Sequence, residues 1–233
     1  MSSPRITSDN HELYKYLSQF VFERRLELFE KIISYRTRYI TVVLEDAYQA
    51  QNASAVLRTC DCMGIQDVHF IENQYKFKLD KQVTLGSDKW LNLHTYRKRK
   101  NISRFVIDKL KKSGYRIVAT SPNKGVVSIS DLNLEKGKIA LLFGTELTGL
   151  SDLAIDNSDE FVKIPMFGFT ESYNLSVSVA LILQSLITRL HKSEKIIWQL
   201  TDEEKIDVLL AWVRKSIRKV ELIEKRFSES GIK

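Results

Sequence analysis

Short apolar runs alternate along the chain with segments whose apolar residues recur at helical spacing. The runs are brief and rich in β-branched residues, and they predict strands at 41–45, 67–71, 91–95, 115–120, 138–143 and 161–164. The helical spacing predicts helices at 53–63, at 102–112 and from about residue 174 to 189. Strands that alternate with helices favour parallel pairing. The predicted fold class is therefore α/β, with a mostly parallel sheet flanked by helices.

Both ends of the chain are predicted to be helical. Apolar residues recur at intervals of three and four from about residue 10 to 35, which predicts one helix. After a polar stretch, a second helix begins with Thr201 or Asp202 as its cap and carries an apolar stripe from Ile206 to Val220. The predicted domains are an N-terminal helical extension (1–38), a central α/β domain (39–190) and a C-terminal helical extension (191–233).

Composition narrows the class of protein. A chain of 233 residues with 43% apolar and 28% charged residues is long enough for one sizeable core and ordinary for a globular protein. Apolar runs stay below the ~18 residues that span a membrane, and the first ten residues lack the apolar core of a signal peptide. We therefore expect a cytoplasmic protein without a membrane partner.

Cysteine and histidine give little sign of metal or redox chemistry. Cys60 and Cys62 are predicted to be small buried residues, because a pair two positions apart provides no disulfide framework. His69 lies within a predicted strand and is interpreted as a packed core histidine, not as a catalytic base. No metal site is expected.

The basic excess is concentrated in one segment. The formal net charge is +7, and residues 97–116 contain nine Lys or Arg against one acid, Asp108. Such a segment suits a polyanion, and it equally suits a solvated helix face. Charge alone leaves both interpretations open.

Polar loops follow three of the predicted strands, which is where open parallel sheets bind ligands. The first loop leads to Asn52, a predicted helix N-cap, and to Arg58 in an otherwise apolar helix. A buried arginine must reach an anion or a carboxylate. Asp61 or Glu45 would satisfy it in a purely structural ion pair.

The second and third loops are richer in glycine and polar residues. Residues 144–151 have the glycine spacing of a phosphate loop but carry Leu150 in place of its lysine, so ATP and NAD are not expected. The third loop follows Pro165, and Ser172 and Asn174 stand where an N-cap is expected for the apolar helix after them. That helix should be buried. A polar loop between buried elements is costly, which predicts a ligand site.

Three sequence blocks at these loops together resemble a known family. They are residues 52–61 (NASAVLRTCD), 143–151 (FGTELTGLS) and 164–177 (IPMFGFTESYNLSV). They are similar to the three motifs of the SpoU/TrmH branch of SPOUT RNA methyltransferases, and the resemblance covers roughly residues 36–190. It implies a deep trefoil knot in the C-terminal part of the α/β domain and a homodimer through the knot region. It also implies methyl transfer from S-adenosylmethionine to a ribose 2′-hydroxyl of RNA.

The resemblance assigns roles to individual residues. The implied catalytic set is Asn52, Arg58, Glu146, Ser172 and Asn174. The implied cofactor-binding set is Thr120, Gly144, Ile164 and Tyr173, the last standing where the family usually has Leu. A guanidinium is effectively never deprotonated in proteins. We therefore expect Arg58 to stabilise negative charge on the 2′-oxygen or to clamp the adjacent phosphate.

The helical extensions resemble those of the family members that methylate guanosine 18 in the D-loop of tRNA. This makes tRNA the expected partner, and guanosine 18 the expected target. The residues expected to contact RNA are Arg25, Arg36, Lys98, Arg99, Lys100 and Arg189. Two alternatives stay open: a 2′-O-methyltransferase of the same family that acts on ribosomal RNA, and a non-catalytic RNA-binding protein with the same fold.

Overall fold

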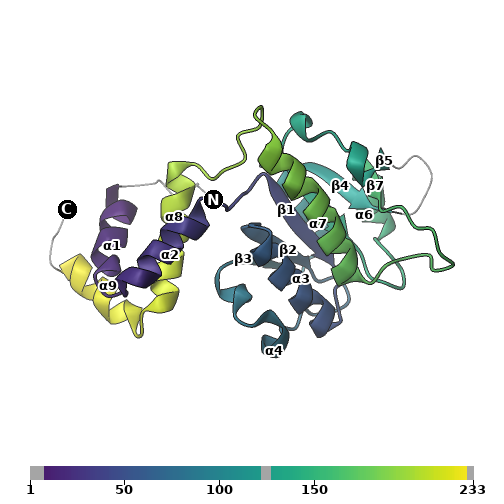
Figure 1. Cartoon of the computed structure of the whole chain (residues 1–233). Coiled ribbons are helices and arrows are strands. Elements are labelled where there is room, and N and C mark those ends of the chain that lie inside the picture. The colour runs from purple at the N-terminus through teal and green to yellow at the C-terminus, as the bar shows by residue number, and fades with distance from the viewer. Residues whose placement is uncertain (1–7, 122–126, 230–233) are drawn as a thin grey trace. The chain divides into compact units, whose positions relative to one another are not determined.

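The computed structural model describes residues 8–121 and 127–229, and the chain divides into two compact units (Figure 1). One unit comprises residues 37–198. The other joins the two terminal segments, 1–36 and 199–233. The first seven residues of the predicted N-terminal extension and the last four of the C-terminal extension lie outside the described residues.

The described part of the larger unit is built on a seven-stranded parallel sheet. The strand order is β3-β2-β1-β6-β4-β7-β5, and each neighbouring pair is parallel. The strands are β1 (Ile40–Glu45), β2 (Asp67–Ile71), β3 (Asn92–Tyr96), β4 (Arg116–Thr120), β5 (Val127–Ser128), β6 (Ile139–Phe143) and β7 (Glu160–Lys163). The predicted α/β class and the parallel sheet are confirmed. Strand β5 was not predicted, because two residues are too few to show a period of two.

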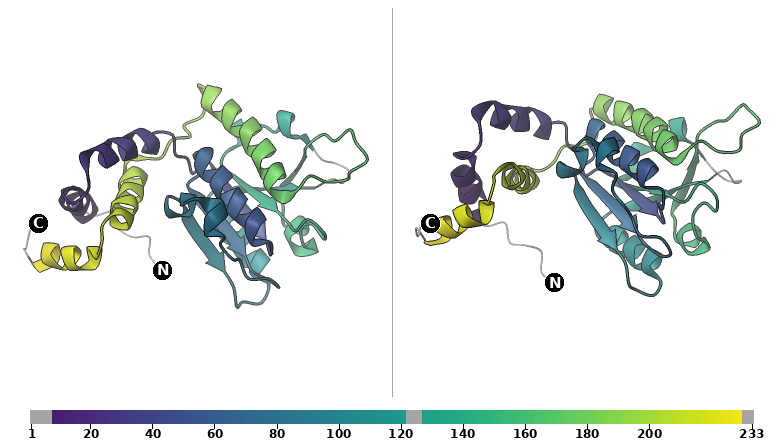
Figure 2. Two further views of the ribbon diagram at one scale, coloured as in Figure 1. Left: turned by 60° about the horizontal axis from the view of Figure 1, so that its bottom comes forward. Right: turned by 90° about the horizontal axis from the view of Figure 1, so that it is seen from below.

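Helices cover both faces of the sheet. On one face, α3 (Ala50–Cys62) and α7 (Leu175–Lys192) share a core with β1 and β6. On the other, α5 (Ile102–Lys112) and α6 (Asp152–Asp156) share a second core with the same strands. Figure 2 shows these two helical layers on opposite sides of the sheet. The short α4 (Lys81–Thr84) packs against α3.

The central strands are buried because both of their faces are covered. All residues of β1 and β6 are buried, and Val42 pairs in register with Leu141. This explains their continuous apolar runs, since a strand covered on both sides has no solvent face to alternate with. Full burial of a side chain such as Leu141 stabilises the fold by roughly 1.5–3 kcal/mol.

Two local predictions on α3 are wrong. The helix begins at Ala50 with Gln49 at the N-cap, so Asn52 lies inside the first turn and is not the cap. Cys60 is buried as predicted, whereas Cys62 is exposed. Residues two apart on a helix point to different faces, and only one of the two cysteines meets the core.

The smaller unit is helical at both ends of the chain, as predicted, but each predicted single helix is two. The helices are α1 (Ser8–Ser18), α2 (Glu23–Ile33), α8 (Asp202–Ser216) and α9 (Val220–Glu229). The first pair breaks before Phe22, whose ψ is 135°, and the second at Ile217 (ψ 132°) and Lys219 (φ +55°). Apolar spacing continues across both breaks, so periodicity does not reveal them. Of the two proposed caps for α8, Thr201 is the observed one and forms a capping box with Glu204.

The core of this unit is centred on Trp212. Phe29 and Trp212 are nearly inaccessible to solvent, with ring centroids 5.3 Å apart, and Leu17 is fully buried. Helix α1 packs against α8 and α9, and α2 packs against α8. Within residues 8–121 and 127–229, no helix combines the length and apolarity of a membrane span.

His69 is buried in the sheet of the larger unit, as predicted. It is 7% exposed, its ring stacks on His94 with centroids 4.6 Å apart, and its Nδ1 lies 3.1 Å from the Tyr96 hydroxyl. Burial, followed by the positive charge of nearby His94, lowers the pKa of His69 from 6.5 to about 3. The ring is therefore neutral at physiological pH and serves in packing.

The buried His69 should make the fold acid-sensitive. The unfolded chain takes up this proton near pH 6.5 and the folded chain only near pH 3, so acidification between these values favours unfolding. The contribution to the unfolding free energy should fall by up to about 1.4 kcal/mol per pH unit. His69→Phe keeps a flat ring and should flatten this decline, measured by urea unfolding from about pH 7 to about pH 4. An unchanged slope in the variant would contradict the assignment.

Candidate active site

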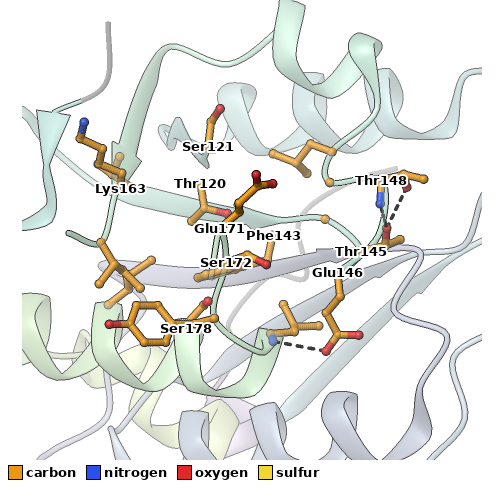
Figure 3. A pocket seen from close by; sticks show the side chains of 18 of the residues that line it. Thr120, Ser121, Phe143, Thr145, Glu146, Thr148, Lys163, Glu171, Ser172 and Ser178 are labelled. Carbon is orange, nitrogen blue, oxygen red and sulfur yellow. Dashed lines mark hydrogen bonds between the residues drawn. The ribbon is translucent and has the colours of Figure 1, made fainter. Parts of the chain in front are cut away.

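The polar loops predicted from the sequence meet at the carboxyl ends of β1, β6 and β7. These ends lie at one edge of the sheet, because β6 pairs with β1 and β4, and β4 pairs with β7. A cavity of about 410 Å³ opens there, with side chains from β4, β6, β7 and α7 around it (Figure 3). Its volume is within the range of sites that bind cofactor-sized molecules.

The four residues expected to bind a cofactor all line this cavity. They are Thr120, Gly144, Ile164 and Tyr173. Glu146 and Ser172 of the expected catalytic set line it as well.

Other polar residues that line the cavity were not predicted, among them Lys163, Glu171 and Ser178. Lys163 and Glu171 immediately precede predicted site residues, and Ser178 lies one helical turn after Asn174. Figure 3 shows Lys163 and Thr148 on opposite sides of the cavity. For Ser178 the spacing was a usable signal, because residues four apart on a helix lie on one face. Adjacency alone did not identify Lys163 or Glu171, because successive residues of an extended segment point to opposite sides.

Two glycines close the loop after β6. Thr145 and Gly149 exchange backbone hydrogen bonds of 3.0 Å in both directions. A Cβ on Gly144 would lie 2.1–2.3 Å from the backbone of Gly149 and Leu150, and Gly149 has a φ of +69°. The loop therefore depends on the absence of a side chain at Gly144 and on the conformational freedom of Gly149.

A buried carboxylate anchors the end of the same loop. Glu45, at the end of β1, is 2% exposed and accepts two hydrogen bonds of 2.8 Å from the backbone N–H and the hydroxyl of Ser151. Asn73 and Ser103 donate to it as well. Ser151 in turn caps α6. The loop after β6 is thus fixed to the core strand β1 through hydrogen bonds to one charged group.

The three sequence blocks converge on Glu146. Its Oε1 accepts hydrogen bonds from Asn174 Nδ2 (3.0 Å), from the backbone N–H of Leu175 (3.3 Å) and from Asn52 Nδ2. Asn174 also donates to Asn52 Oδ1 at 3.2 Å. The carboxylate lies at the N-terminus of α7, where the helix dipole favours negative charge.

The two candidate caps of α7 have different positions. Asn174 is the N-cap, and its Oδ1 accepts from the backbone N–H of Ser176 at 2.9 Å. Ser172 does not cap the helix but lines the cavity. The amide of Asn174 therefore serves the helix with its oxygen and Glu146 with its nitrogen.

Arg58 does not occupy the buried position expected from the sequence. Its side chain is exposed. Within the described part of the chain it makes no hydrogen bond or ion pair, either with Asp61 or with Glu45. It does not line the cavity. The prediction of a buried arginine that reaches a carboxylate is wrong, because its helix position faces outward. The guanidinium is open to a phosphate.

Four of the residues expected to contact RNA face solvent. Arg25 is exposed on α2, and Lys98, Arg99 and Lys100 are exposed after β3. The guanidinium of Arg99 lies 3.8 Å from the centroid of the Phe105 ring. The exposed positions leave these side chains accessible to a polyanion.

The other two are engaged within the chain. Arg36 is 2% exposed and lies 5.3 Å from the Trp212 ring centroid. Arg189 donates to the backbone carbonyls of Ile129 (3.0 Å) and Leu132 (2.6 Å). Arg36 therefore packs against an aromatic ring, and Arg189 links α7 to the backbone at 129–132. Among the described residues, no group of three His, Cys, Asp or Glu is placed to hold a metal ion.

Residues 39–184 match the model of the SpoU rRNA Methylase family. The chain belongs to this family. It is 45% identical to the tRNA (guanosine(18)-2′-O)-methyltransferase of Borreliella burgdorferi, over 89% of this chain and 93% of that protein. It is 32% identical to the enzyme of the same name from Thermus thermophilus, over 69% and 80%.

Solved structures of related proteins agree with the fold. The TrmH/SpoU tRNA modifying enzyme of A. aeolicus superimposes with a TM-score of 0.74 at 26% identity, covering 84% of this chain and 98% of that one. The SpoU methyltransferase AviRb of Streptomyces viridochromogenes, in complex with AdoMet, gives a TM-score of 0.56 at 18% identity, over 70% and 62%. The similarity to AviRb is evidence for the fold alone.

Gly144→Ala should damage the cavity wall. The added Cβ would overlap backbone atoms, which cannot rotate away, so the loop must open at a cost of roughly 1–3 kcal/mol. Gly168→Ala is the matched control, because a Cβ there meets nothing within 4 Å. Urea unfolding should show a loss of stability for Gly144→Ala alone. Equal stability of the two variants would contradict the close packing of the loop.

Proposed function

We propose that this protein transfers a methyl group from S-adenosylmethionine to the ribose 2′-hydroxyl of guanosine 18 in the D-loop of tRNA. The observation that carries the proposal is the convergence of Asn52 and Asn174 on Glu146 at the rim of a cofactor-sized cavity. Relatives named for methylation of guanosine 18 support the choice of substrate, since one is 45% identical over 89% of the chain. The proposal places the enzyme in the cytoplasm with its tRNA.

The lining of the cavity fits S-adenosylmethionine. Thr120, Gly144, Ile164 and Tyr173 would hold it, with the bare backbone at Gly144 permitting close approach. When bound, this cofactor supplies an electrophilic methyl group on a sulfonium ion. The cavity also presents the carboxylate of Glu171 and the ammonium group of Lys163. These opposite charges match the ammonium and carboxylate of a methionine moiety.

Residues at the rim would position the ribose. A ribose hydroxyl is a weak nucleophile, so its proton must leave or be shared during the transfer. Asn52 and Asn174 hold Glu146 through its Oε1, and the second carboxylate oxygen can accept a hydrogen bond from the hydroxyl. Ser172 lines the same cavity and would support this loop. Arg58 would stabilise negative charge on the 2′-oxygen or bind the adjacent phosphate, as its exposed guanidinium permits.

The proposal includes a homodimer through the region of α7 and a deep trefoil knot in the C-terminal part of the α/β unit. The apolar sequence of α7 predicts a helix that is buried on all of its sides. Most of its apolar residues are buried, but Val177 and Leu181 are each 42% exposed. Residues four apart lie on one face of a helix. An apolar strip of this kind supports a contact with a second copy.

Methyl transfer to RNA provides the direct test. An unmodified tRNA transcript with a guanosine at position 18 should receive one methyl group from labelled S-adenosylmethionine, at that ribose. Mapping of the 2′-O-methylated nucleotide identifies the position. Methylation of ribosomal RNA alone would favour the ribosomal alternative. Binding of RNA without any transfer, together with no binding of S-adenosylmethionine by calorimetry, would favour the non-catalytic one.

Arg58→Lys separates an electrostatic role from a role as base. Lysine keeps the charge but loses the planar fork, so we expect a rate roughly a hundredfold below wild type. Its dependence on pH should parallel that of wild type, measured as kcat/KM for methyl transfer. Arg58→Met removes the charge and should be slower still. If the pH dependence of kcat/KM for Arg58→Lys shows an ionisation that wild type lacks, the electrostatic account is contradicted.

A further inference from the structure

The edge of the sheet that carries the cavity continues across three more strands. β1 pairs with β6, β2 pairs with β1, and β3 lies at the end of the sheet, all in parallel. The loops after β1, β2 and β3 therefore lie in sequence along this edge, roughly 5 Å apart per strand. An RNA whose reacting ribose is at the rim of the cavity can run along these loops.

Two tyrosines on the loops after β1 and β2 form an aromatic pair. The ring centroids of Tyr48 and Tyr75 are 5.2 Å apart and their planes make an angle of 45°. Tyr75 is 48% exposed, and Tyr48 is partly exposed. Exposed aromatic rings are the surfaces on which proteins stack unpaired bases, each stacked base contributing severalfold or more to affinity.

Asp46 holds this pair in place. Its backbone has a φ of +53°, a conformation that Asp tolerates. Its Oδ1 accepts hydrogen bonds from the backbone N–H groups of Asn73 (2.8 Å), Gln74 (2.8 Å) and Tyr75 (3.2 Å). The loop after β2 is thereby fixed to the loop after β1. The rings need little further ordering to bind a ligand, which favours affinity.

Hydrogen bonds connect the tyrosine pair to the candidate active site. Gln49 Nε2 donates to the Tyr48 hydroxyl at 3.3 Å. Asn52 Nδ2 donates both to Gln49 Oε1 and to Glu146. Tyr48 is therefore separated from Glu146 by two side chains, and a base beside the reacting nucleotide would lie within its reach.

Three exposed lysines lie close to Tyr75 along the chain. Lys76, Lys78 and Lys81 are exposed and make no ion pair within the part of the chain that the structure describes. The neighbouring acids are engaged by the backbone: Glu72 accepts from the N–H of Phe77 (3.0 Å), and Asp80 accepts from that of Gln82 (2.9 Å). Flat rings beside unpaired lysines are typical of single-stranded nucleic-acid sites.

We propose that Tyr48, Tyr75, Lys76 and Lys78, here named the tyrosine–lysine surface, bind the RNA next to the ribose that is methylated. The rings stack on unpaired bases, and the lysines contact phosphates. The inference rests on the proposed function, since it takes the RNA substrate and the reacting position from it. RNA is favoured over a second copy of this chain, because exposed lysines beside flat rings suit phosphates and bases, whereas the contact with a second copy is assigned to the exposed apolar strip of α7.

Alanine at both tyrosines tests the stacking. Tyr48→Ala with Tyr75→Ala should raise the Kd and the KM for an unmodified tRNA transcript roughly ten- to hundredfold. The Kd for S-adenosylmethionine and the Tm should stay at wild-type values. Tyr48→Phe with Tyr75→Phe keeps the rings and should bind tRNA like wild type. Equal losses in the Ala and Phe variants, or no loss in the Ala variant, would overturn the proposal.

Salt dependence tests the lysines. Lys76→Gln with Lys78→Gln should lower the slope of log affinity against log salt by about 0.7 for each lysine that binds a phosphate. The control is Lys192→Gln with Lys195→Gln, which removes two exposed charges at and after the far end of α7, one of them paired with Glu135, and should keep the wild-type slope. Equal slopes in the two variants would overturn the assignment of these lysines to phosphates.

Two further measurements distinguish RNA binding at the tyrosine–lysine surface from a dimer contact and from the methyl-transfer activity itself. Light scattering should give the same oligomeric state for wild type and all variants, and a change in the tyrosine variant would assign the surface to a second copy and overturn the proposal. If wild type binds tRNA but methylates none, the proposed function fails. In that case, the relative tRNA affinities of the variants still test whether RNA binds at the tyrosine–lysine surface.

Discussion

One carboxylate oxygen of Glu146 accepts three hydrogen bonds, and the rest of the site depends on this interaction. The donors come from the first turn of α3 and from the start of α7. A carboxylate at a helix N-terminus is electrostatically favoured, and its donors are fixed by two helices that pack on the same face of the sheet. Neutral amides and a helix terminus therefore hold an acidic side chain at the cavity rim.

The sheet explains why distant segments can cooperate in this way. A parallel sheet collects the carboxyl ends of all its strands at one edge, so each loop after a strand becomes a neighbour of the others. Asn52 and Glu146 are separated by 94 positions along the chain, yet the segments that carry them follow paired strands, β1 and β6. The same geometry places the tyrosine–lysine surface beside the cavity and continues it toward Lys98, Arg99 and Lys100 after β3.

Much of the fold could be predicted from the sequence because strands such as β1 and β6 are apolar on both faces, and this pattern is local. The same local reasoning misassigned Asn52. An asparagine near the start of a helix looks like an N-cap in the sequence, even where its side chain instead donates to a distant carboxylate. It also missed the breaks at Ile217 and Phe22, where apolar spacing persists although the backbone does not stay helical. Arg58 was placed inside because its neighbours are apolar, whereas the helix turns it outward. The candidate site residues were proposed from the resemblance to family motifs, which carries long-range information that spacing lacks.

The anchoring of Ser151 by Glu45 makes the two walls of the cavity unequal. A shift of the loop after β6 would strip hydrogen bonds from a carboxylate that is 2% exposed, and an unsatisfied buried charge costs several kcal/mol. The tip of the loop between β7 and α7 is open to solvent instead, since Phe167 and Phe169 are 98% and 109% exposed. The first wall thus acts as a fixed template, and a ligand that needs more room must obtain it by displacing the second.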